Sequence, residues 1–163
     1  MAKTEIDRAV QQSLLDRLTD ELPRESADRT TNRDSSARTF RASVQRDVEW
    51  LLNTRRTMVQ TTDDHPQVAQ SVHQFGLPDI TGFYLSAVSS RERLSEAILD
   101  TIRRFEPRLT NVQVKLNDLK DGQVPQVRFS ISATLLMDPS PEQILFDTVL
   151  QVSTGVYEVS EEG

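Results

Sequence analysis

The stretch VRFSISATL at residues 127–135 alternates apolar and polar residues with a period of two. That period is typical of a strand with one face buried and the other in water. Two further runs, at residues 112–116 and 144–152, repeat the pattern, and a short apolar run follows at residues 156–159. Because a turn signal at Asp121-Gly122 separates the run at residues 112–116 from the run at residues 127–135, we expect antiparallel hairpins. The pattern predicts a small antiparallel sheet of three to four strands.

The segments that precede the sheet have the period of helices. We expect one helix at residues 43–53 with Ser43 as its N-cap, and another that begins at a capping box formed by Ser89 and Glu92. The second helix should end before Pro107, because the residue before a proline is disfavoured in helical geometry. The expected apolar stripes comprise Val44, Val48 and Leu51 or Leu52 in the first helix, and Leu94, Ala97, Ile98, Ile102 and Phe105 in the second. Helices followed by hairpins predict an α+β domain whose helices cover one face of the sheet.

The N-terminal part of the chain predicts a helix that is tethered outside this domain. In residues 4–22 apolar residues recur at every fourth position, and Pro23 ends the pattern. Residues 23–41 are rich in Ser, Thr, Arg and Asp, which is typical of a flexible linker. The predicted organisation is therefore a docking helix at residues 1–22, a linker, and a domain at residues 42–160. Since an isolated helix is marginal in water, it should pack either on its own domain or on a partner.

The composition excludes several classes of function. The chain has 163 residues and a formal net charge of -6, which argues against general nucleic-acid binding, although a local string of arginines lies between residues 24 and 46. It has no cysteine, so disulfides, thiolate metal sites and cysteine nucleophiles are excluded. Residues 1–8 carry Glu5 and Asp7 where a signal peptide needs a basic start and an apolar run, and no apolar run approaches the roughly 20 residues of a membrane helix. We therefore expect a cytoplasmic protein.

Few residues are arranged for catalysis or metal binding. His65 and His73 are the only histidines, and neither is spaced with a third ligand, so we expect exposed loop residues and no metal or other cofactor. Glu106 follows the apolar Phe105 and is a candidate general acid. Arg108, close by in sequence, instead favours an ionised carboxylate paired with arginine, within the chain or across a subunit interface.

Five segments, in their order and spacing, resemble one known family. They are SLLDRL at residues 13–18, SVQRDVEWLLNTRR at 43–56, FGLPDITG at 75–82, AILDTIRRFEPRL at 97–109 and FDTVL at 146–150. The chain resembles the TssE family of type VI secretion baseplate subunits, which is itself similar to the phage baseplate wedge proteins once described as lysozyme-like.

The resemblance implies a structural protein of a contractile apparatus, at the inner-membrane face when assembled. Its expected partners are the wedge subunits TssF, TssG and TssK and the sheath subunits TssB and TssC, whose polymerisation it would start. The family's Glu-Pro-Arg motif falls on Glu106, Pro107 and Arg108, where it is an interface element. A sheath that assembles by strand exchange needs an open sheet edge, and we expect that edge at the last two strands, with contacts from Phe146, Thr148 and Leu150. The tethered helix should bind another subunit through Leu14, Leu15 and Leu18.

Two other functions are compatible with the residues alone. A peptidoglycan muramidase would need two carboxylates at glycosidase separation, roughly 5 to 10 Å, together with export to the cell wall. A regulatory adaptor would bind its partner through the N-terminal helix alone.

Overall fold

The chain is described from a computed structural model, in which the placed residues are residue 10 and residues 12–19, 33–59, 65–69, 71–79, 87–117, 126–138, 140–151 and 154–161. The helices are α1 (Leu14–Leu18), α2 (Arg33–Asn53), α3 (Pro66–Ala69), the 3-10 helix η2 (Val72–Gln74) and α4 (Val88–Phe105). The strands are β1 (Leu109–Leu116), β2 (Gln126–Leu135), β3 (Glu142–Gln151) and β4 (Val156–Glu161). None of these helices is long and apolar enough to cross a membrane.

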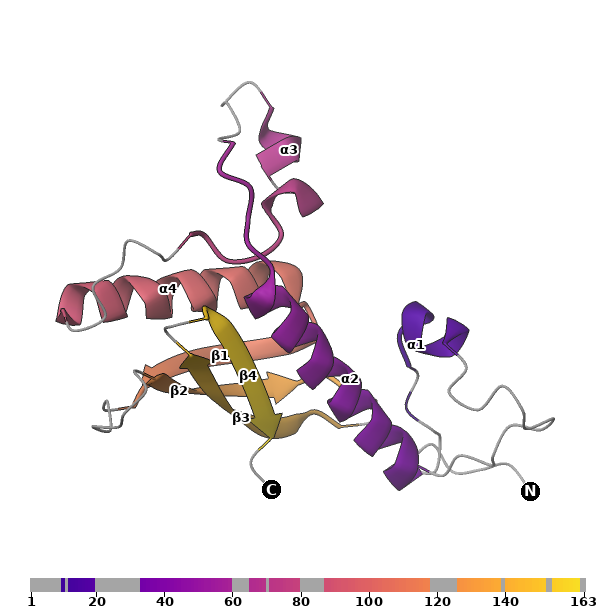
Figure 1. The fold of residues 1–163 in the computed structure, drawn as a ribbon. Helices are drawn as coiled ribbons and strands as arrows, with labels where there is room; N and C mark the ends of the chain where they lie inside the picture. Colours follow the sequence, from indigo (N-terminus) through magenta and orange to yellow (C-terminus); the bar gives the residue numbers. More distant parts are fainter. Residues whose placement is uncertain are drawn as a thin grey trace, which may run out of the picture.

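The four strands form one antiparallel sheet in the order β1-β2-β3-β4 (Figure 1). The period-two pattern of β2 is confirmed, because alternate side chains from Val127 to Leu135 are buried. The same alternation continues in β3, where Phe146 pairs with Ile131 across the ladder. The expected α+β class with a small antiparallel sheet is therefore confirmed.

Helices α2 and α4 cover the apolar face of this sheet (Figure 1). Helix α4 packs mainly on β1 and α2 mainly on β4. The core between the layers includes Val48 and Ile98 from the helices and Phe129 and Phe146 from the strands. The opposite face of β2 carries Arg128, Ser130, Ser132 and Thr134, which are polar, so the sheet is covered on one side by its own helices.

Helix α2 is about twice as long as predicted, because it begins at Arg33 and not near residue 43. The predicted linker and domain boundary at residue 41 was therefore wrong for residues 33–41. Ala37 and Phe40 are buried and extend the apolar stripe of the helix N-terminally. Ser43 is not an N-cap; it is buried inside the helix and its hydroxyl donates to the carbonyl of Phe40 at 2.9 Å.

Helix α4 ends where the sequence predicts and begins differently. Its last residue is Phe105 and Pro107 follows in a turn, as expected. The predicted capping box was wrong: the helix starts at Val88, its N-cap is Ala87, and no side chain caps the first turn. The predicted buried stripe is confirmed at Leu94, Ile98 and Ile102.

The long N-terminal helix predicted at residues 4–22 was wrong in extent. Residues 10, 12, 13 and 19 are not helical, and α1 spans one short turn capped by the Ser13 hydroxyl, which accepts from the Asp16 N–H. Residues 1–9 and 20–32 lie outside the described residues, as do the predicted turn at residues 121–122 and position 152.

Candidate protein-binding surface

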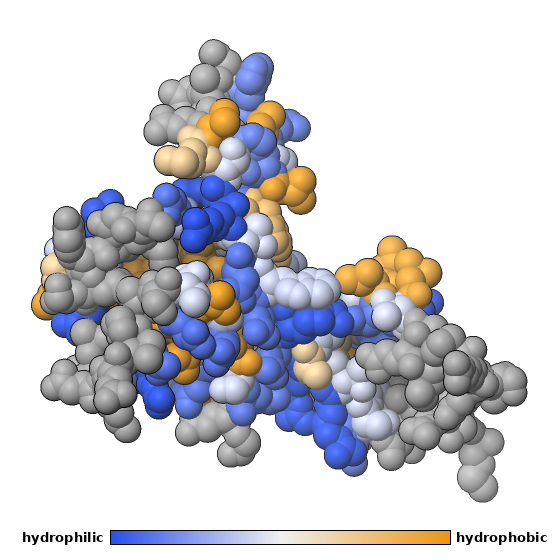
Figure 2. Space-filling model, viewed as in Figure 1, coloured by the Kyte–Doolittle hydropathy of each residue, from blue (hydrophilic) through white to orange (hydrophobic). Residues whose placement is uncertain are grey.

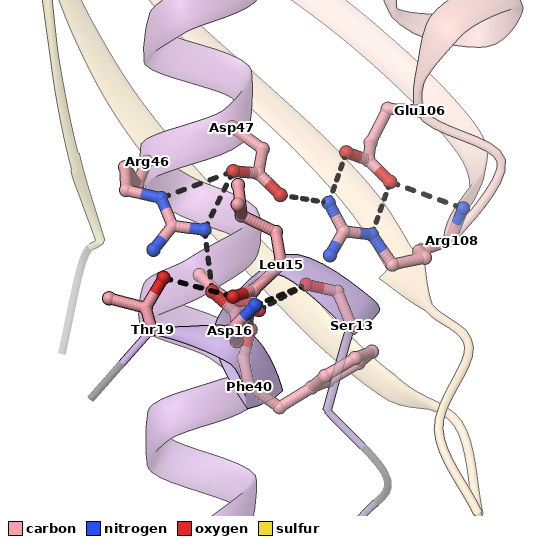
Figure 3. A network of polar contacts seen from close by, with 10 residues as sticks. Ser13, Leu15, Asp16, Thr19, Phe40, Arg46, Asp47, Glu106 and Arg108 are labelled. Atoms are coloured by element: carbon pink, nitrogen blue, oxygen red, sulfur yellow. Dashed lines mark hydrogen bonds and ion pairs between the residues drawn. The ribbon is translucent and has the colours of Figure 1, made fainter.

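An ion-pair network joins the turn after α4 to the middle of α2 (Figure 3). Arg108 donates from Nε and Nη2 to both carboxylate oxygens of Glu106, and from Nη2 to Oδ2 of Asp47 at 2.7 Å. Its guanidinium also lies 5.8 Å from the centre of the Phe40 ring. Hydrogen bonds to Glu106 raise the pKa of Arg108 above its usual value, and those to Asp47 act in the same direction against the opposing effect of burial.

Glu106 is 4% exposed, so its carboxylate belongs to the interior of the domain. Both oxygens accept hydrogen bonds from the Arg108 guanidinium, so both are already engaged within the domain. The expected pairing of Glu106 with arginine is therefore found within the chain. The expectation that both charged heads face a partner was wrong for Glu106, because α2 and the turn enclose it.

The network continues from Asp47 to the N-terminal segment (Figure 3). Arg46 Nη2 bonds Asp47 Oδ1 at 2.9 Å and Asp16 Oδ1 at 2.7 Å. Burial acts to raise the pKa of Asp16, but hydrogen bonds from Ser13 and Arg46 outweigh it and hold the pKa below its usual value. The Val10 N–H adds a bond to the Ser36 hydroxyl at 2.9 Å. The N-terminal segment is thus held on α2 by polar contacts and by the buried Val10 side chain.

The leucines of α1 are largely exposed. Leu14, Leu15 and Leu18 are 71%, 53% and 76% exposed, respectively. Figure 2 shows apolar atoms gathered on α1 beside the hydrophilic surface of α2. Single exposed leucines are common, but several together on a positioned turn are not. We call Leu14, Leu15 and Leu18 the leucine face of α1, and it is a candidate protein-binding surface.

A second exposed apolar group lies on an arm that projects from the end of α2 (Figures 1 and 2). The arm includes α3 and η2, and its exposed apolar side chains include Met58, Val59, Val68 and Val72. Its base is tied by two backbone bonds, from Arg56 N–H to the Leu77 carbonyl at 2.7 Å and from Leu77 N–H to the Thr54 carbonyl at 2.8 Å. Two segments quoted above for the resemblance, at residues 43–56 and 75–82, therefore meet in space.

Gly76 allows the backbones of these two segments to approach each other closely. Its φ is +100°, and a Cβ there would lie 2.3 Å from the Thr54 carbonyl oxygen. Only glycine permits both the backbone conformation and this close approach. The exposed His65 and His73 lie on the same arm, and the described residues contain no group of three His, Cys, Asp or Glu side chains placed to hold a metal ion.

The predicted contacts on the third strand were wrong. Phe146, Thr148 and Leu150 lie on β3, which is an internal strand, and all three side chains are buried in the core. The edges of the sheet are β1 and β4. Of the last two strands, which were both expected at an edge, only β4 lies there. The sequence could not show this, because an internal strand and an edge strand can share the same alternation.

The pairing of three charged residues of the network, Asp16, Arg46 and Asp47, was not predicted from the sequence. Asp47 is 61 positions from Arg108, and Arg46 is 30 positions from Asp16. No local spacing signals such pairs. The only local indication is that Arg46 and Asp47 lie beside the apolar stripe of a helix.

Comparison with known proteins identifies the family. The family model described as baseplate wedge protein gp25 matches residues 38–140, more than half of the chain, including most of α2, the Glu-Pro-Arg turn and β1 and β2. No similarity is detected to a curated protein or to a solved structure. The match confirms the resemblance drawn from the sequence segments and supports a structural role, with contacts to other subunits, in a phage-tail-like baseplate. The chain belongs to the baseplate wedge protein gp25 family.

Proposed function

We propose that the protein is the wedge subunit of a type VI secretion baseplate, which joins TssF, TssG and TssK and starts the assembly of the TssB–TssC sheath. The family match over residues 38–140 carries the proposal. The assignment to a type VI system is supported in addition by the resemblance of the five segments quoted above. The corresponding location is the cytoplasmic side of the inner membrane.

The leucine face of α1 is the proposed contact with a wedge subunit. A helical turn of five residues cannot stabilise itself in water, yet α1 is positioned by the Ser13 cap and the Asp16–Arg46 pair. Ordering the turn before binding lowers the entropy cost of docking its leucines in an apolar groove.

Arg108 is the proposed contact at the Glu-Pro-Arg turn. Its Nε and Nη2 are bonded internally, whereas Nη1 has no partner among the described residues, and the side chain is 22% exposed. Glu106 then acts as a positioning residue that holds the guanidinium plane, while the exposed Pro107 fixes the turn. This division of roles replaces the symmetrical pair expected from the sequence.

Affinity purification from cells that express the whole gene cluster tests the proposal. Mass spectrometry should recover baseplate and sheath subunits with the tagged chain, and Leu14→Glu/Leu18→Glu should reduce recovery of the wedge subunits at least tenfold. Val88→Glu is a matched control, because Val88 is an exposed apolar residue at the start of α4, where a carboxylate complements the helix dipole. Unchanged recovery with the leucine variant would overturn the docking role of α1.

The muramidase alternative has a separate readout. Glu106 is the candidate general acid, and its two hydrogen bonds from Arg108 oppose that role. Cleavage of purified peptidoglycan by the isolated protein, with no recovery of baseplate subunits, would replace the proposed function with a hydrolase.

A further inference from the structure

The N-terminal segment, described at residue 10 and residues 12–19, is held on α2 mainly by polar contacts. Helix α1 has no buried residue, and Val10 is the only apolar side chain of the described segment that is buried. The Val10 N–H donates to the Ser36 hydroxyl, and Arg46 donates to the Asp16 carboxylate. A segment that buries little apolar surface opens locally at a low cost in free energy. The segment therefore has a docked state and a released state, and the five-residue turn is lost on release because it cannot persist alone.

The docked segment forms one end of a row of alternating charges. From α1 across α2 to the turn after α4, the members of the row are Asp16, Arg46, Asp47, Arg108 and Glu106 (Figure 3). Arg46 Nη2 donates to both Asp16 Oδ1 and Asp47 Oδ1. Asp47 in turn accepts from Arg46 through Oδ1 and from Arg108 through Oδ2. Each inner member is thus shared by the neighbours on its two sides, so a change at one end alters the contacts of the next.

The charges of the row give the sign of the coupling between its ends. When the segment is released, two arginines and two carboxylates remain in the row, and their charges cancel. If Arg108 is also absent, one arginine and two carboxylates remain. This net negative charge opposes the return of the Asp16 carboxylate to Arg46. Arg108 therefore stabilises the docked segment, although the two are joined only through Arg46 and Asp47.

Helix geometry adds a second reason for the coupling. Arg46 and Asp47 are consecutive residues of α2, and consecutive residues of a helix do not face each other. Asp16 holds the Arg46 guanidinium from one side, and Arg108 holds the Asp47 carboxylate from the other. The ion pair between Arg46 and Asp47 therefore depends on the outer neighbours that orient the two side chains.

We propose that the N-terminal segment docks reversibly on α2 and that its docking is coupled, through Arg46 and Asp47, to the Glu-Pro-Arg turn. The docked segment presents the leucine face of α1 and keeps Asp47 on Arg108. A subunit that binds the leucine face favours the docked state, because a ligand shifts an equilibrium toward the state that it binds. By linkage, it also strengthens a second contact at Arg108. This consequence for partners rests on the proposed function, whereas the coupling is a property of the isolated chain.

Hydrogen exchange of the isolated full chain, followed by NMR, tests the coupling without a partner. The Arg17 and Thr19 N–H groups donate to carbonyls within the α1 turn, so their exchange reports release of the segment. Arg108→Met should speed this exchange by about threefold or more. In the reverse direction, Asp16→Asn should speed exchange of the Arg108 Nε–H, which is bonded to a carboxylate, by about threefold or more.

Two control variants separate this coupling from general effects. Arg104→Met removes an exposed arginine from the last turn of α4, outside the row. Leu94→Ala leaves a cavity in the core and lowers the stability of the whole domain. Neither should alter exchange within the α1 turn. Unchanged exchange at both ends of the row would overturn the coupling, and so would equal acceleration in Leu94→Ala, because the segment would then follow global stability.

The consequence for partners is measured by recovery of wedge subunits in the affinity purification. Asp16→Asn leaves the leucine face intact but weakens docking, and it should lower recovery by about threefold or more. Asp34→Asn, which changes an exposed aspartate at the start of α2, should not. Full recovery with Asp16→Asn, while Leu14→Glu/Leu18→Glu lowers it, would show that the leucines bind without docking and contradict this consequence. If the leucine variant also keeps full recovery, the proposed role of α1 fails, and the exchange result alone decides on the coupling.

Discussion

Replacing Arg108 with methionine tests whether the ion-pair network belongs to the fold. Methionine keeps an unbranched stem against Phe40 but leaves the carboxylates of Glu106 and Asp47 without their shared cation. Removing one partner of a buried pair costs about 3–5 kcal/mol. Arg108 and Asp47 are 22% and 24% exposed, so water screens part of this cost, and we expect a loss of about 2–3 kcal/mol.

Thermal unfolding measures this loss. For a chain of this length 1 kcal/mol corresponds to roughly 2–4 °C, so Arg108→Met should lower the melting temperature by about 6–10 °C. The double variant Glu106→Gln/Arg108→Met should recover more than half of the loss, because no buried carboxylate is then left unpaired at position 106. Arg104→Met, which replaces an exposed arginine in the last turn of α4, is the control and should change little.

Two results would refute the reasoning. If Arg108→Met melts within about 2 °C of the wild type and only sheath binding is lost, the pair acts between subunits. If the double variant is as unstable as the single one, packing of the guanidinium accounts for the loss and charge does not. The double variant also separates folding from binding, since a folded protein without Arg108 that still nucleates sheath would exclude the arginine as a contact.

Three further changes probe other parts of the structure. The Tyr157 hydroxyl is buried without a hydrogen-bond partner in the described part of the chain, so Tyr157→Phe should raise stability by about 1 kcal/mol in urea unfolding; a decrease would reveal a bound water. Asn53→Ala should lower the free energy of unfolding by about 1–2 kcal/mol. Because it leaves the Tyr157 N–H and carbonyl on β4 without these bonds, it should also cause concentration-dependent association through β4, visible by sedimentation. Arg46→Met should speed tryptic cleavage after Arg17 several-fold by freeing the N-terminal segment. Because the pKa of Asp16 is lowered, its contribution is present above about pH 4 and is lost as the pH falls through that lowered pKa, which NMR of the segment can follow.

The sheet could be predicted from the sequence because burial on one face imposes a period of two. The start of α2 could not be predicted as well, since residues 33–41 are mostly polar and their composition is typical of a linker. Ala37 and Phe40 nevertheless continue the stripe of Val44 and Val48 at helical spacing. The long helix was therefore signalled weakly, by one small and one aromatic residue, and tertiary packing stabilises it.

The candidate site was predictable only in part. The Glu-Pro-Arg turn could be named from local sequence, but its burial depends on Asp47, which lies on another element. Whether a strand is internal or at an edge depends on the pairing of the whole sheet, which explains the wrong assignment of Phe146 and its neighbours. The hydrogen bonds from Gln45 and Asn53 of α2 to the Val159 and Tyr157 carbonyls of β4 likewise join distant segments, and no local pattern encodes them.

The surfaces available to partners depend on the contacts that α2 already makes within the domain. Its apolar stripe faces the core, its amides at Gln45 and Asn53 donate to carbonyls of β4, and Arg46 and Asp47 bind the N-terminal segment and the turn after α4. A partner that bound this helix at these side chains would have to break contacts that hold the domain together, at a cost of several kcal/mol. The leucine face of α1, Nη1 of Arg108 and the arm involve no such loss. A subunit that must fold before assembly and then bind several neighbours at once needs this separation, because each contact can form without unfolding another.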